Sequence, residues 1–307
     1  MIEWEEQKIE LARDLTPRLY SGQYLQSIFN AWEERHQNGG WILKNKDWSP
    51  YFLNMRPIGN SPDLLADVAF AMALLHENEM PDVNKVVGVE MAGIPIATAT
   101  SMINHERRGF SLPFCYTRPL DRYPTEEELK KALETGDTLD LKIRKPKQAI
   151  ETLETMKRKG ELKRYGQKNL VEGRLVDGDV FAIWDDMATD SASKLIARLI
   201  LQYEAERLGV DIECVDAGYS LDRGAGAVKA GIEYAEKGKE IGDPNPQSMF
   251  MHFIIDLTSV GLPTLESVMA PHEFALIRSY QEDKERYQDK GVQEYVLKER
   301  RAPSEFL

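Results

Sequence analysis

The chain has 307 residues, of which 42% are hydrophobic and 29% are charged, a composition typical of a soluble globular protein. A formal net charge of -12 argues against non-specific nucleic-acid binding, and no apolar run is long enough to span a membrane. The acidic N-terminus is not a secretory signal, and Cys115 and Cys214 indicate neither a disulfide framework nor a metal site. We therefore expect a cytoplasmic protein of one large domain or two small ones.

Residues 1–40 have the apolar spacing of helices. Trp4, Leu11 and Leu15 fall on one helical face, and a second helix is expected after a break near Pro17. This segment is expected to pack against the rest of the chain or against a partner chain, without a chemical role.

Residues 41–54 have the pattern of a hairpin, because two apolar runs flank a polar turn. Lys44 lies near the predicted turn, and Phe52 lies in the second apolar run. The pattern alone leaves Lys44 open to two interpretations, a solvated turn lysine or a cation that meets a ligand.

A helix and a strand are predicted next, over 62–75 and 85–89. The loop 90–95 follows, with Met91 and Ala92 before a glycine, and a further helix begins after it. Glycine lets the backbone approach an anion closely, although a plain strand-to-helix turn would need the same residue.

Another strand is predicted over 114–119, with Arg118 at its exit. Residues 120–160 are charged and have helical spacing. The stretch 161–173 is then rich in basic residues, among them Lys163. It is either an exposed linker or a mobile cationic loop.

The rest of the chain is organised around residues 179–194. The apolar run 180–184 predicts a buried strand, and Asp185 and Asp186 stand at its C-terminal end. A loop of small and hydroxyl-bearing residues leads into a helix: Thr189, Asp190, Ser191, Ala192 and Ser193. Ligands of open α/β sheets bind at such strand ends, and a helix N-terminus favours phosphate. Two carboxylates there suit ribose hydroxyls or hydrated Mg²⁺, unless they form only a solvated turn.

The C-terminal part adds strands over 212–216 and 249–257, with Arg223 in a glycine-rich loop between them. A bidentate arginine suits a planar carboxylate, and a plain loop arginine is the competing interpretation. The tail 279–307 is charged and helical, and we assign it no chemistry.

In their order along the chain, these segments resemble type I phosphoribosyltransferases, and orotate phosphoribosyltransferase in particular. The family's signature for phosphoribosyl pyrophosphate (PRPP) is an apolar strand, two acids and a threonine-containing loop, as in 179–194. Tyr165-Gly166 and Val171-Glu172-Gly173 are similar to the end of the family's catalytic loop. The resemblance covers roughly residues 41–227, interrupted by the insert.

The resemblance implies an α/β fold, the type I phosphoribosyltransferase fold, with a parallel sheet flanked by helices and a small hood from both terminal segments. It implies an N-terminal helical segment (1–40) and a phosphoribosyltransferase domain (41–278) with a helical insert at about 120–160. A C-terminal helical tail (279–307) completes the chain.

It also implies transfer of ribose 5-phosphate from PRPP to orotate, which gives orotidine 5′-monophosphate and pyrophosphate in pyrimidine biosynthesis. Asp185 and Asp186 would bind the ribose hydroxyls and, indirectly through PRPP, the cofactor Mg²⁺. Residues 189–193 would hold the 5′-phosphate, and the loop with Met91 and Ala92 would hold pyrophosphate.

Further roles follow from the same resemblance. Arg118, Lys163 and Tyr165 would close over the reaction centre, with Lys168 in the same loop, and the family's sharing of this loop between subunits implies a homodimer. The orotate contacts would come from three other residues: Lys44, Phe52 and Arg223.

Three departures from the family pattern leave alternatives open. Ala92 and Pro119 stand where the family has lysines, and Asp190-Ser191 replaces small residues of the phosphate loop. An acid beside a phosphate is unfavourable unless it points away or a metal intervenes. A phosphoribosyltransferase for another base, and a non-catalytic protein that binds PRPP or a nucleotide, are the alternatives.

Overall fold

The computed structural model describes residues 2–43, 46–121, 124–135, 141–143, 145–160, 169–188, 192–223, 239–240, 243, 249–300 and 302. The chain forms two compact units. The first joins Met1–Ala71 to Ile254–Leu307, and the second is Met72–Phe253. One unit is therefore built from both terminal segments, as predicted for the hood. No helix in the described part of the chain is both long and apolar enough to cross a membrane.

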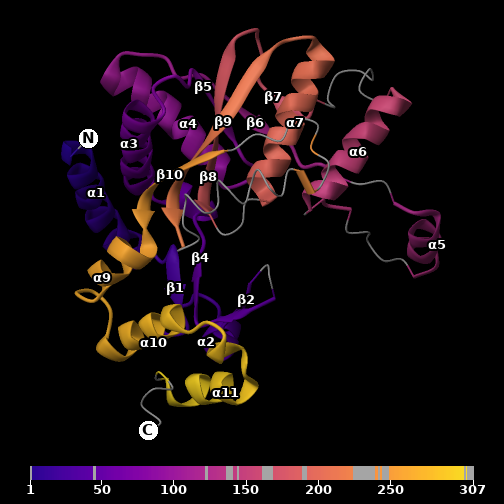
Figure 1. Ribbon diagram of the computed structural model, residues 1–307. Coiled ribbons are helices and arrows are strands. Elements are labelled where there is room, and N and C mark those ends of the chain that lie inside the picture. Colours follow the sequence, from indigo (N-terminus) through magenta and orange to yellow (C-terminus); the bar gives the residue numbers. More distant parts are fainter. Residues whose placement is uncertain are drawn as a thin grey trace. The chain divides into compact units, whose positions relative to one another are not determined.

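A six-stranded sheet carries the central fold (Figure 1), in the order β10-β9-β8-β5-β6-β7. Its strands are β5 (Lys85–Gly88), β6 (Phe114–Thr117), β7 (Val171–Glu172), β8 (Asp179–Ala188), β9 (Ile212–Asp222) and β10 (Phe250–Asp256). β5 runs parallel to β6 and β8, and β8 runs parallel to β9. β7 is antiparallel to β6 at one end of the sheet. The sheet is thus mostly parallel, as the sequence predicted.

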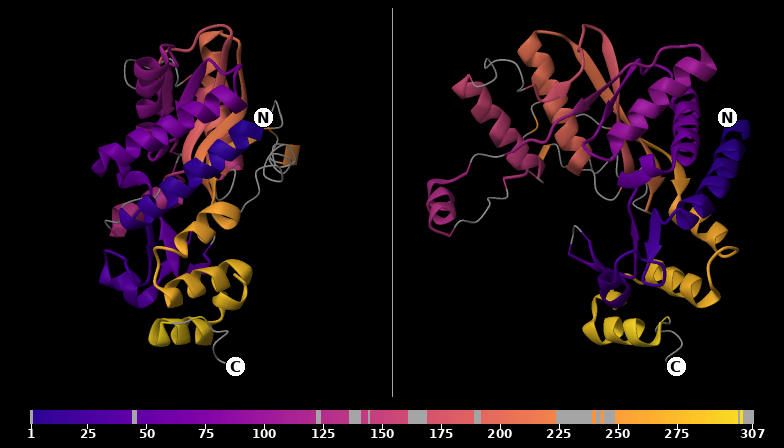
Figure 2. Two further views of the ribbon diagram at one scale, coloured as in Figure 1. Left: turned by 90° about the vertical axis from the view of Figure 1, so that its left-hand side faces the viewer. Right: turned by 180° about the vertical axis from the view of Figure 1, so that it is seen from behind.

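Helices cover both faces of this sheet (Figure 2). They are α3 (Pro62–Glu79), α4 (Gly93–Ile103), α6 (Pro146–Lys159) and α7 (Ala192–Leu208), with a π-helical turn, η2 (Asn104–Arg108), after α4. A further helix of the second unit, α5 (Glu126–Thr135), has no buried side chain among its described residues. A capping box starts α5, because the Thr125 N–H donates to Glu128 Oε2 at 2.9 Å and the Glu128 N–H donates to Thr125 Oγ1 at 3.2 Å.

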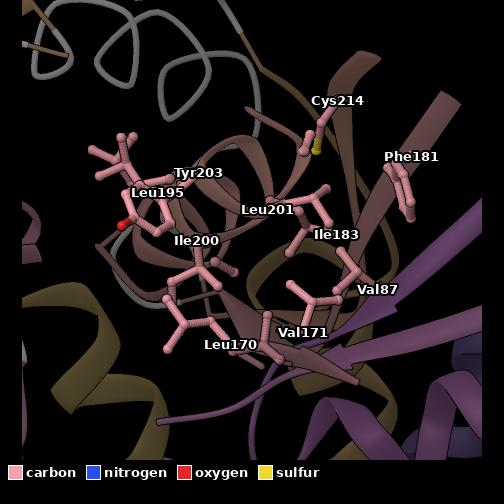
Figure 3. Packing of buried hydrophobic residues seen from close by; sticks show 14 of the residues in the cluster. Val87, Leu170, Val171, Phe181, Ile183, Leu195, Ile200, Leu201, Tyr203 and Cys214 are labelled. Atoms are coloured by element: carbon pink, nitrogen blue, oxygen red, sulfur yellow. The ribbon is translucent and has the colours of Figure 1, made fainter. Parts of the chain in front are cut away.

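The main hydrophobic cluster lies between the sheet and the helices α6 and α7 (Figure 3). Phe181 and Ile183 of β8 belong to this cluster, together with Leu195 and Ile200 of α7. Trp184 points to the opposite face, where its indole and the side chains of two methionines, Met72 and Met80, surround Gly218. β8 is therefore buried on both faces, which explains its nearly continuous apolar sequence.

β8 is longer than its apolar run. The predicted strand over 180–184 is confirmed, but the strand begins at Asp179 and continues to Ala188, which pairs with Asp222 of β9. The acidic pair therefore lies within the strand and not after it. The pairing with β9 continues through these polar residues, because backbone hydrogen bonds do not depend on side-chain polarity.

The first unit combines helices with two short antiparallel ladders, in which β1 pairs with β4 and β2 pairs with β3. Its N-terminal elements are α1 (Ile2–Ser21), β1 (Leu25–Ser27), α2 (Glu34–Gly39), β2 (Trp41–Ile42), β3 (Trp48–Ser49), β4 (Tyr51–Leu53) and η1 (Arg56–Asn60). Its C-terminal elements are η4 (Leu257–Gly261), α9 (Leu262–Leu265), α10 (Pro271–Glu282), η5 (Arg286–Gln288) and α11 (Lys290–Glu299). Buried Glu273 of α10 joins the two segments, since it accepts hydrogen bonds from Ser27 Oγ (2.5 Å) and Tyr20 Oη (2.9 Å).

Two predictions for the N-terminal region are wrong. α1 continues through Pro17 to Ser21, although proline has no N–H to donate within the helix, because Leu15 and Leu19 on either side are buried. Residues 25–27 form β1 and not a helix, because they pair with 51–53. That pairing also takes 51–53 away from the predicted hairpin, which is confirmed only for β2 and β3.

Candidate functional site

The candidate site lies where the chain changes direction in the sheet. β5 and β8 are parallel neighbours, but β5 leads through α4 to β6, whereas β8 leads through α7 to β9 on the other side. Right-handed crossovers place α4 and α7 on opposite faces of the sheet. A crevice opens at such a switch point, outside the carboxyl ends of the two strands. The loop before α4 and the acidic pair of β8 both lie at this edge.

Direct backbone contact joins the α4 loop to β8. The Val89 N–H donates to the Trp184 carbonyl at 2.8 Å. A Cβ atom on Gly93 would lie 2.2 Å from that carbonyl oxygen and 3.2 Å from the Cα of Asp185, so no side chain fits there. The predicted glycine is thus needed for packing against β8, whether or not an anion binds. The contact also fixes the α4 N-terminus beside the acidic pair.

The two residues before this glycine differ in exposure. Ala92 is buried, whereas the side chain of Met91 is 64% exposed. Ala92 offers no side-chain hydrogen bond to the start of α4. The Gly93 N–H already donates to the Val89 carbonyl at 3.0 Å, and Pro95 has no N–H. Among the first three residues of α4, the Ile94 N–H is therefore the group that this turn can offer to an anion.

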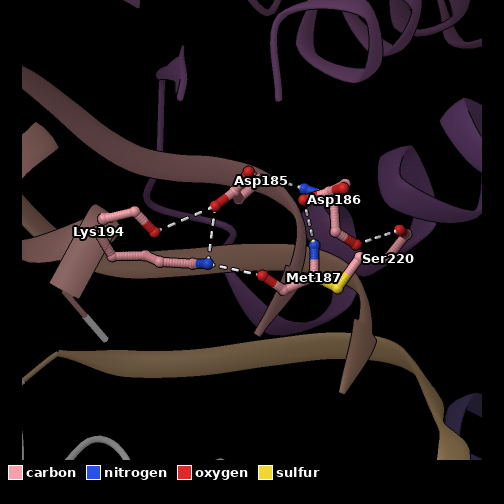
Figure 4. Close-up of polar contacts among 6 residues, drawn as sticks. Asp185, Asp186, Met187, Lys194 and Ser220 are labelled. Atoms are coloured by element: carbon pink, nitrogen blue, oxygen red, sulfur yellow. Dashed lines mark hydrogen bonds and ion pairs between the residues drawn. The ribbon is translucent and has the colours of Figure 1, made fainter. Parts of the chain in front are cut away.

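The acidic pair is almost enclosed (Figure 4): Asp185 is 7% exposed and Asp186 is 8% exposed. Asp185 Oδ2 accepts hydrogen bonds from Lys194 Nζ at 2.7 Å and, more weakly, from Ser193 Oγ at 3.4 Å. Its Oδ1 accepts the Asp186 N–H at 3.0 Å. Both oxygens of Asp185 are thus occupied by groups of the protein.

Asp186 has different surroundings. Its Oδ1 accepts the Met187 N–H at 2.9 Å, and its backbone carbonyl accepts a hydrogen bond from Ser220 Oγ of β9 at 2.6 Å. Side chains alternate along a strand, so Asp185 shares a face of β8 with Ile183, and Asp186 shares the opposite face with Trp184. The Asp185 carboxylate is held toward α7 by Lys194, and the Asp186 carboxyl group lies close enough to it for a hydrogen bond between the two side chains.

Burial raises the pKa of Asp186 to about 7, and the neighbouring charge of Asp185 adds to this rise. The Lys194 ammonium acts in the opposite direction. Near neutral pH, Asp186 is consequently poised between its protonated and ionised forms, a property typical of carboxylates in functional sites.

Arg118 and Arg223 both lie at the carboxyl edge of the sheet. Arg118 directly follows β6 and forms an ion pair with Glu172 at 3.2 Å. Arg223 directly follows β9 and is half-buried. The structure therefore brings these two arginines to the same sheet edge as the acidic pair.

The remaining predicted residues belong to the first unit or lie outside the described residues. Phe52 lies on β4 in the first unit, where its ring stacks on Trp41 with the ring centres 6.1 Å apart. Part of the predicted site falls outside the described residues: Lys44, Lys163, Tyr165, Lys168, Thr189, Asp190 and Ser191. Their roles stay predictions.

The sequence analysis missed Lys194 as a site residue. A lysine in the first turn of a helix opposes the helix dipole, and this turn of α7 contains no acid to offset it. That unfavourable position was the available signal, because it indicates a carboxylate from outside the helix. Asp185 is that carboxylate.

No protein-family model matches the chain. The orotate phosphoribosyltransferase of Thermococcus gammatolerans is 25% identical to it over 187 residues, which are 61% of this chain and 72% of that protein. Among solved structures it is similar to the UMP synthase of Leishmania donovani (TM-score 0.49, 16% identity, 90% of this chain). It is also similar to the orotate phosphoribosyltransferase of Francisella tularensis (TM-score 0.48, 13% identity, 86% of this chain and 96% of that one). The chain spans only 42% of the UMP synthase.

The mostly parallel six-stranded sheet with helices on both faces is the α/β architecture predicted from the resemblance to type I phosphoribosyltransferases. In sequence, the chain resembles orotate phosphoribosyltransferases in particular.

Proposed function

We propose that the chain is an enzyme that transfers ribose 5-phosphate from PRPP to orotate, giving orotidine 5′-monophosphate and pyrophosphate. The observation that carries this proposal is the switch point, where the Gly93 loop, the acidic pair and the start of α7 meet. The name of the curated relative supports orotate as the acceptor and pyrimidine biosynthesis as the context.

The site offers a group for each part of PRPP. Backbone N–H groups at the start of α7 suit the 5′-phosphate, and the Ile94 N–H at the start of α4 suits the pyrophosphate. The acidic pair lies between these two helix ends and suits the ribose hydroxyls. Substrate held at three points is oriented for reaction, which removes much of the entropic barrier.

In the reaction, a ring nitrogen of orotate forms a bond to the anomeric carbon while the bond from that carbon to pyrophosphate breaks. Positive charge develops on the sugar ring as pyrophosphate leaves. A buried carboxylate close to the ring stabilises this charge strongly, because little water screens it. Asp186, which is 8% exposed, meets that requirement.

The departing pyrophosphate is an anion, and cationic side chains stabilise it. Arg118 lies at the correct edge of the sheet, and we assign Lys163, Tyr165 and Lys168 to the same task on the strength of the sequence resemblance. A loop that closes over the site also excludes water from the reactive sugar. Because the family shares this loop between subunits, a homodimer is part of the proposal.

Mg²⁺ fits this site as a companion of PRPP, since it commonly binds substrate phosphates together with one or two protein carboxylates. Among the described residues no cluster of three or more His, Cys, Asp or Glu side chains forms a metal site. Asp186 would hold the ion together with substrate oxygens, whereas both oxygens of Asp185 are occupied. When bound, the ion neutralises charge on the pyrophosphate.

The acceptor side of the proposal rests on Arg223, Lys44 and Phe52. Arg223 follows β9 at the carboxyl edge and can pair with the orotate carboxylate through two parallel hydrogen bonds. Lys44 and Phe52 keep the roles implied by the sequence resemblance, near the base.

A second candidate function is a protein of this fold that binds PRPP without turning it over. The observation that favours it is Ala92, a small, buried, apolar residue where the family has a lysine. Without that cation, pyrophosphate would be held by a backbone N–H group alone at this loop.

Orotate consumption, followed by its ultraviolet absorbance, tests the proposal. The complete mixture contains the protein, orotate, PRPP and Mg²⁺, and each is omitted in turn. We expect loss of orotate only in the complete mixture. No loss, with PRPP binding still detected by calorimetry, would select the non-catalytic function or another acceptor, and a panel of other bases would separate these two.

A further inference from the structure

Lys194 is a buried cation inside the proposed site. Its side chain is 3% exposed, although it lies in the first turn of α7. Its ammonium donates to Asp185 Oδ2 at 2.7 Å and to the Met187 carbonyl at 2.6 Å (Figure 4), and it lies 5.8 Å from the centre of the Tyr219 ring. A buried ammonium needs such partners, because losing its water is costly.

These contacts connect the two elements that carry the site. Asp185 and Met187 belong to β8, whereas Lys194 belongs to α7, so one ammonium ties the end of the strand to the first turn of the helix. The predicted phosphate loop lies in the sequence between Met187 and Lys194, which this hydrogen bond joins. The position of the α7 N-terminus relative to the acidic pair therefore depends on Lys194.

The same contacts give the two acids different partners. Asp185 has a counter-ion supplied by the protein, and its two oxygens receive Lys194, Ser193 and the Asp186 N–H. Asp186 lies beside Asp185, and its side chain forms no ion pair among the contacts of the described residues. A carboxylate that is already neutralised stabilises a developing positive charge less than one that is not.

We propose that Lys194 is a positioning residue that neutralises Asp185 and ties β8 to α7, so that Asp186 alone of the acidic pair meets the ribose. Asp185 then has a structural task, and its charge is needed only because Lys194 is charged. This inference rests on the proposed function, since it assigns different tasks to the two acids of that site.

Four variants test the inference: Lys194→Met, Asp185→Asn, the double variant Lys194→Met/Asp185→Asn, and Lys194→Arg. Each single neutral variant leaves one buried charge without its partner, whereas the double variant removes both charges and keeps similar shapes. The measurements are the thermal midpoint, the PRPP dissociation constant by calorimetry with Mg²⁺, and kcat and KM for orotate turnover. Asp186→Asn is the reference for loss of the ribose contact.

We expect each single neutral variant to lower the thermal midpoint and to weaken PRPP binding by about 100-fold, because an unpaired buried charge displaces the start of α7 from β8. The double variant should regain the midpoint and bind PRPP within about 10-fold of the unaltered chain, with kcat largely restored. Lys194→Arg should keep part of the affinity, and Asp186→Asn should fold but lose kcat.

Two outcomes would overturn the inference in a chain that does turn orotate over. One is a double variant that regains its thermal midpoint but stays as inactive as Asp185→Asn, which would show that Asp185 touches the substrate. The other is Lys194→Met with unchanged PRPP affinity and kcat. Absence of both PRPP binding and turnover in the unaltered chain would instead overturn the proposed function, and this inference with it.

Discussion

At the residue scale, Asp186 lowers the stability of the folded chain when it is ionised, and in the proposed reaction it stabilises positive charge on the ribose. It is buried beside another carboxylate, and its pKa of about 7 is far above the ordinary value of 3.8. When the pKa of an acid is higher in the folded state than in the unfolded one, stability falls as the pH rises from the ordinary value through the folded value. Wild-type protein should thus lose stability between about pH 4 and pH 7 because of this group.

Replacing Asp186 with Asn should therefore raise the thermal midpoint at pH 8 and lower kcat for orotate turnover. The expected rise is about 2–4 °C for each kcal/mol of repulsion removed. At pH 5 the difference from wild type should be smaller, because Asp186 is then largely protonated in the folded chain. Differential scanning calorimetry at both pH values and a steady-state assay measure the two effects.

Asp82→Asn is the matched control, since it removes the same charge from an exposed position. It should change neither the midpoint nor kcat. A lower midpoint for Asp186→Asn at pH 8 would contradict the assigned electrostatics, and an unchanged kcat would contradict the assigned task.

Gly93 is the second residue on which the site depends. Gly93→Ala should destabilise the fold, because its Cβ would lie 2.2 Å from the Trp184 carbonyl oxygen and force the α4 loop away from β8. Overpacking of this kind costs about 1–3 kcal/mol, and the displaced loop should also weaken pyrophosphate binding. Urea unfolding and pyrophosphate calorimetry measure the two losses.

Gly39→Ala provides the comparison, because no atom lies within 4 Å of the added Cβ there and the substitution favours the helix. If both alanine variants unfold at the same urea concentration as wild type, the close approach at Gly93 is not what holds the loop.

The sequence predicted that the acidic pair lies at the end of a strand, but it did not predict the surroundings of that pair. Asp185 and Asp186 were candidates because two acids after an apolar strand form a local pattern. Their position inside β8 was not predicted, because it depends on β8 continuing to Ala188, and that depends on pairing with a strand 34 residues further along the chain. The partner of Lys194 is likewise set by the return of α7 onto the sheet.

At the scale of elements, the same distinction separates correct predictions from wrong ones. The strand β5 and the helix α3 were predicted because their own apolar spacing defines them. β1 was not, because it is a three-residue strand that exists through its pairing with β4. Short elements are determined by their partners more than by their own residues, and the partners are distant in sequence.

His252 joins three elements of the central unit and should make their stability depend on pH. Its Nδ1 lies 2.8 Å from Glu79 of α3, and its Nε2 lies 2.9 Å from Asp216 of β9. Burial alone would lower the pKa of His252, but hydrogen bonds to Asp216 and Glu79 outweigh burial and raise it. Both ring nitrogens donate only in the protonated imidazolium, so the cluster favours the charged form.

A raised histidine pKa gives stability that is complete below the ordinary value of 6.5 and is lost as the pH rises through the folded value. His252→Gln should therefore lower the thermal midpoint at pH 6 more than at pH 9. The exposed His105→Gln should shift the midpoint equally little at both pH values. Equal effects of the two substitutions at pH 6 would show that the histidine between the carboxylates is not charged.

At the scale of the whole molecule, the predicted insert at about 120–160 consists of two parts with different relations to the fold. α6 contributes Ala149 and Leu153 to the main hydrophobic cluster. In α5, by contrast, none of the described side chains is buried, and Leu133 is 86% exposed. Composition could not separate the two, because both helices are charged and amphipathic.

The chain enters and leaves the outer part of the insert at one point. Asp121 and Lys142 form an antiparallel bridge, and the Ile143 N–H donates to the Leu120 carbonyl at 3.0 Å. The ends of the segment 122–141 are thus already adjacent. A two-residue Asn-Gly turn could join them without moving the strands of the core, since such turns connect antiparallel neighbours.

We expect that replacing 122–141 with Asn-Gly leaves the thermal midpoint within about 2 °C of wild type, because none of the residues described in this segment belongs to the main cluster and because the closure of a loop costs little. Leu153→Ala should lower stability by about 2–5 kcal/mol, since it removes buried methyl groups from that cluster.

If the shortened chain unfolds as readily as Leu153→Ala, α5 is part of the fold. If it keeps its midpoint but changes its sedimentation from that of the full chain, α5 contacts a second subunit, and the proposed homodimer would have one of its surfaces there.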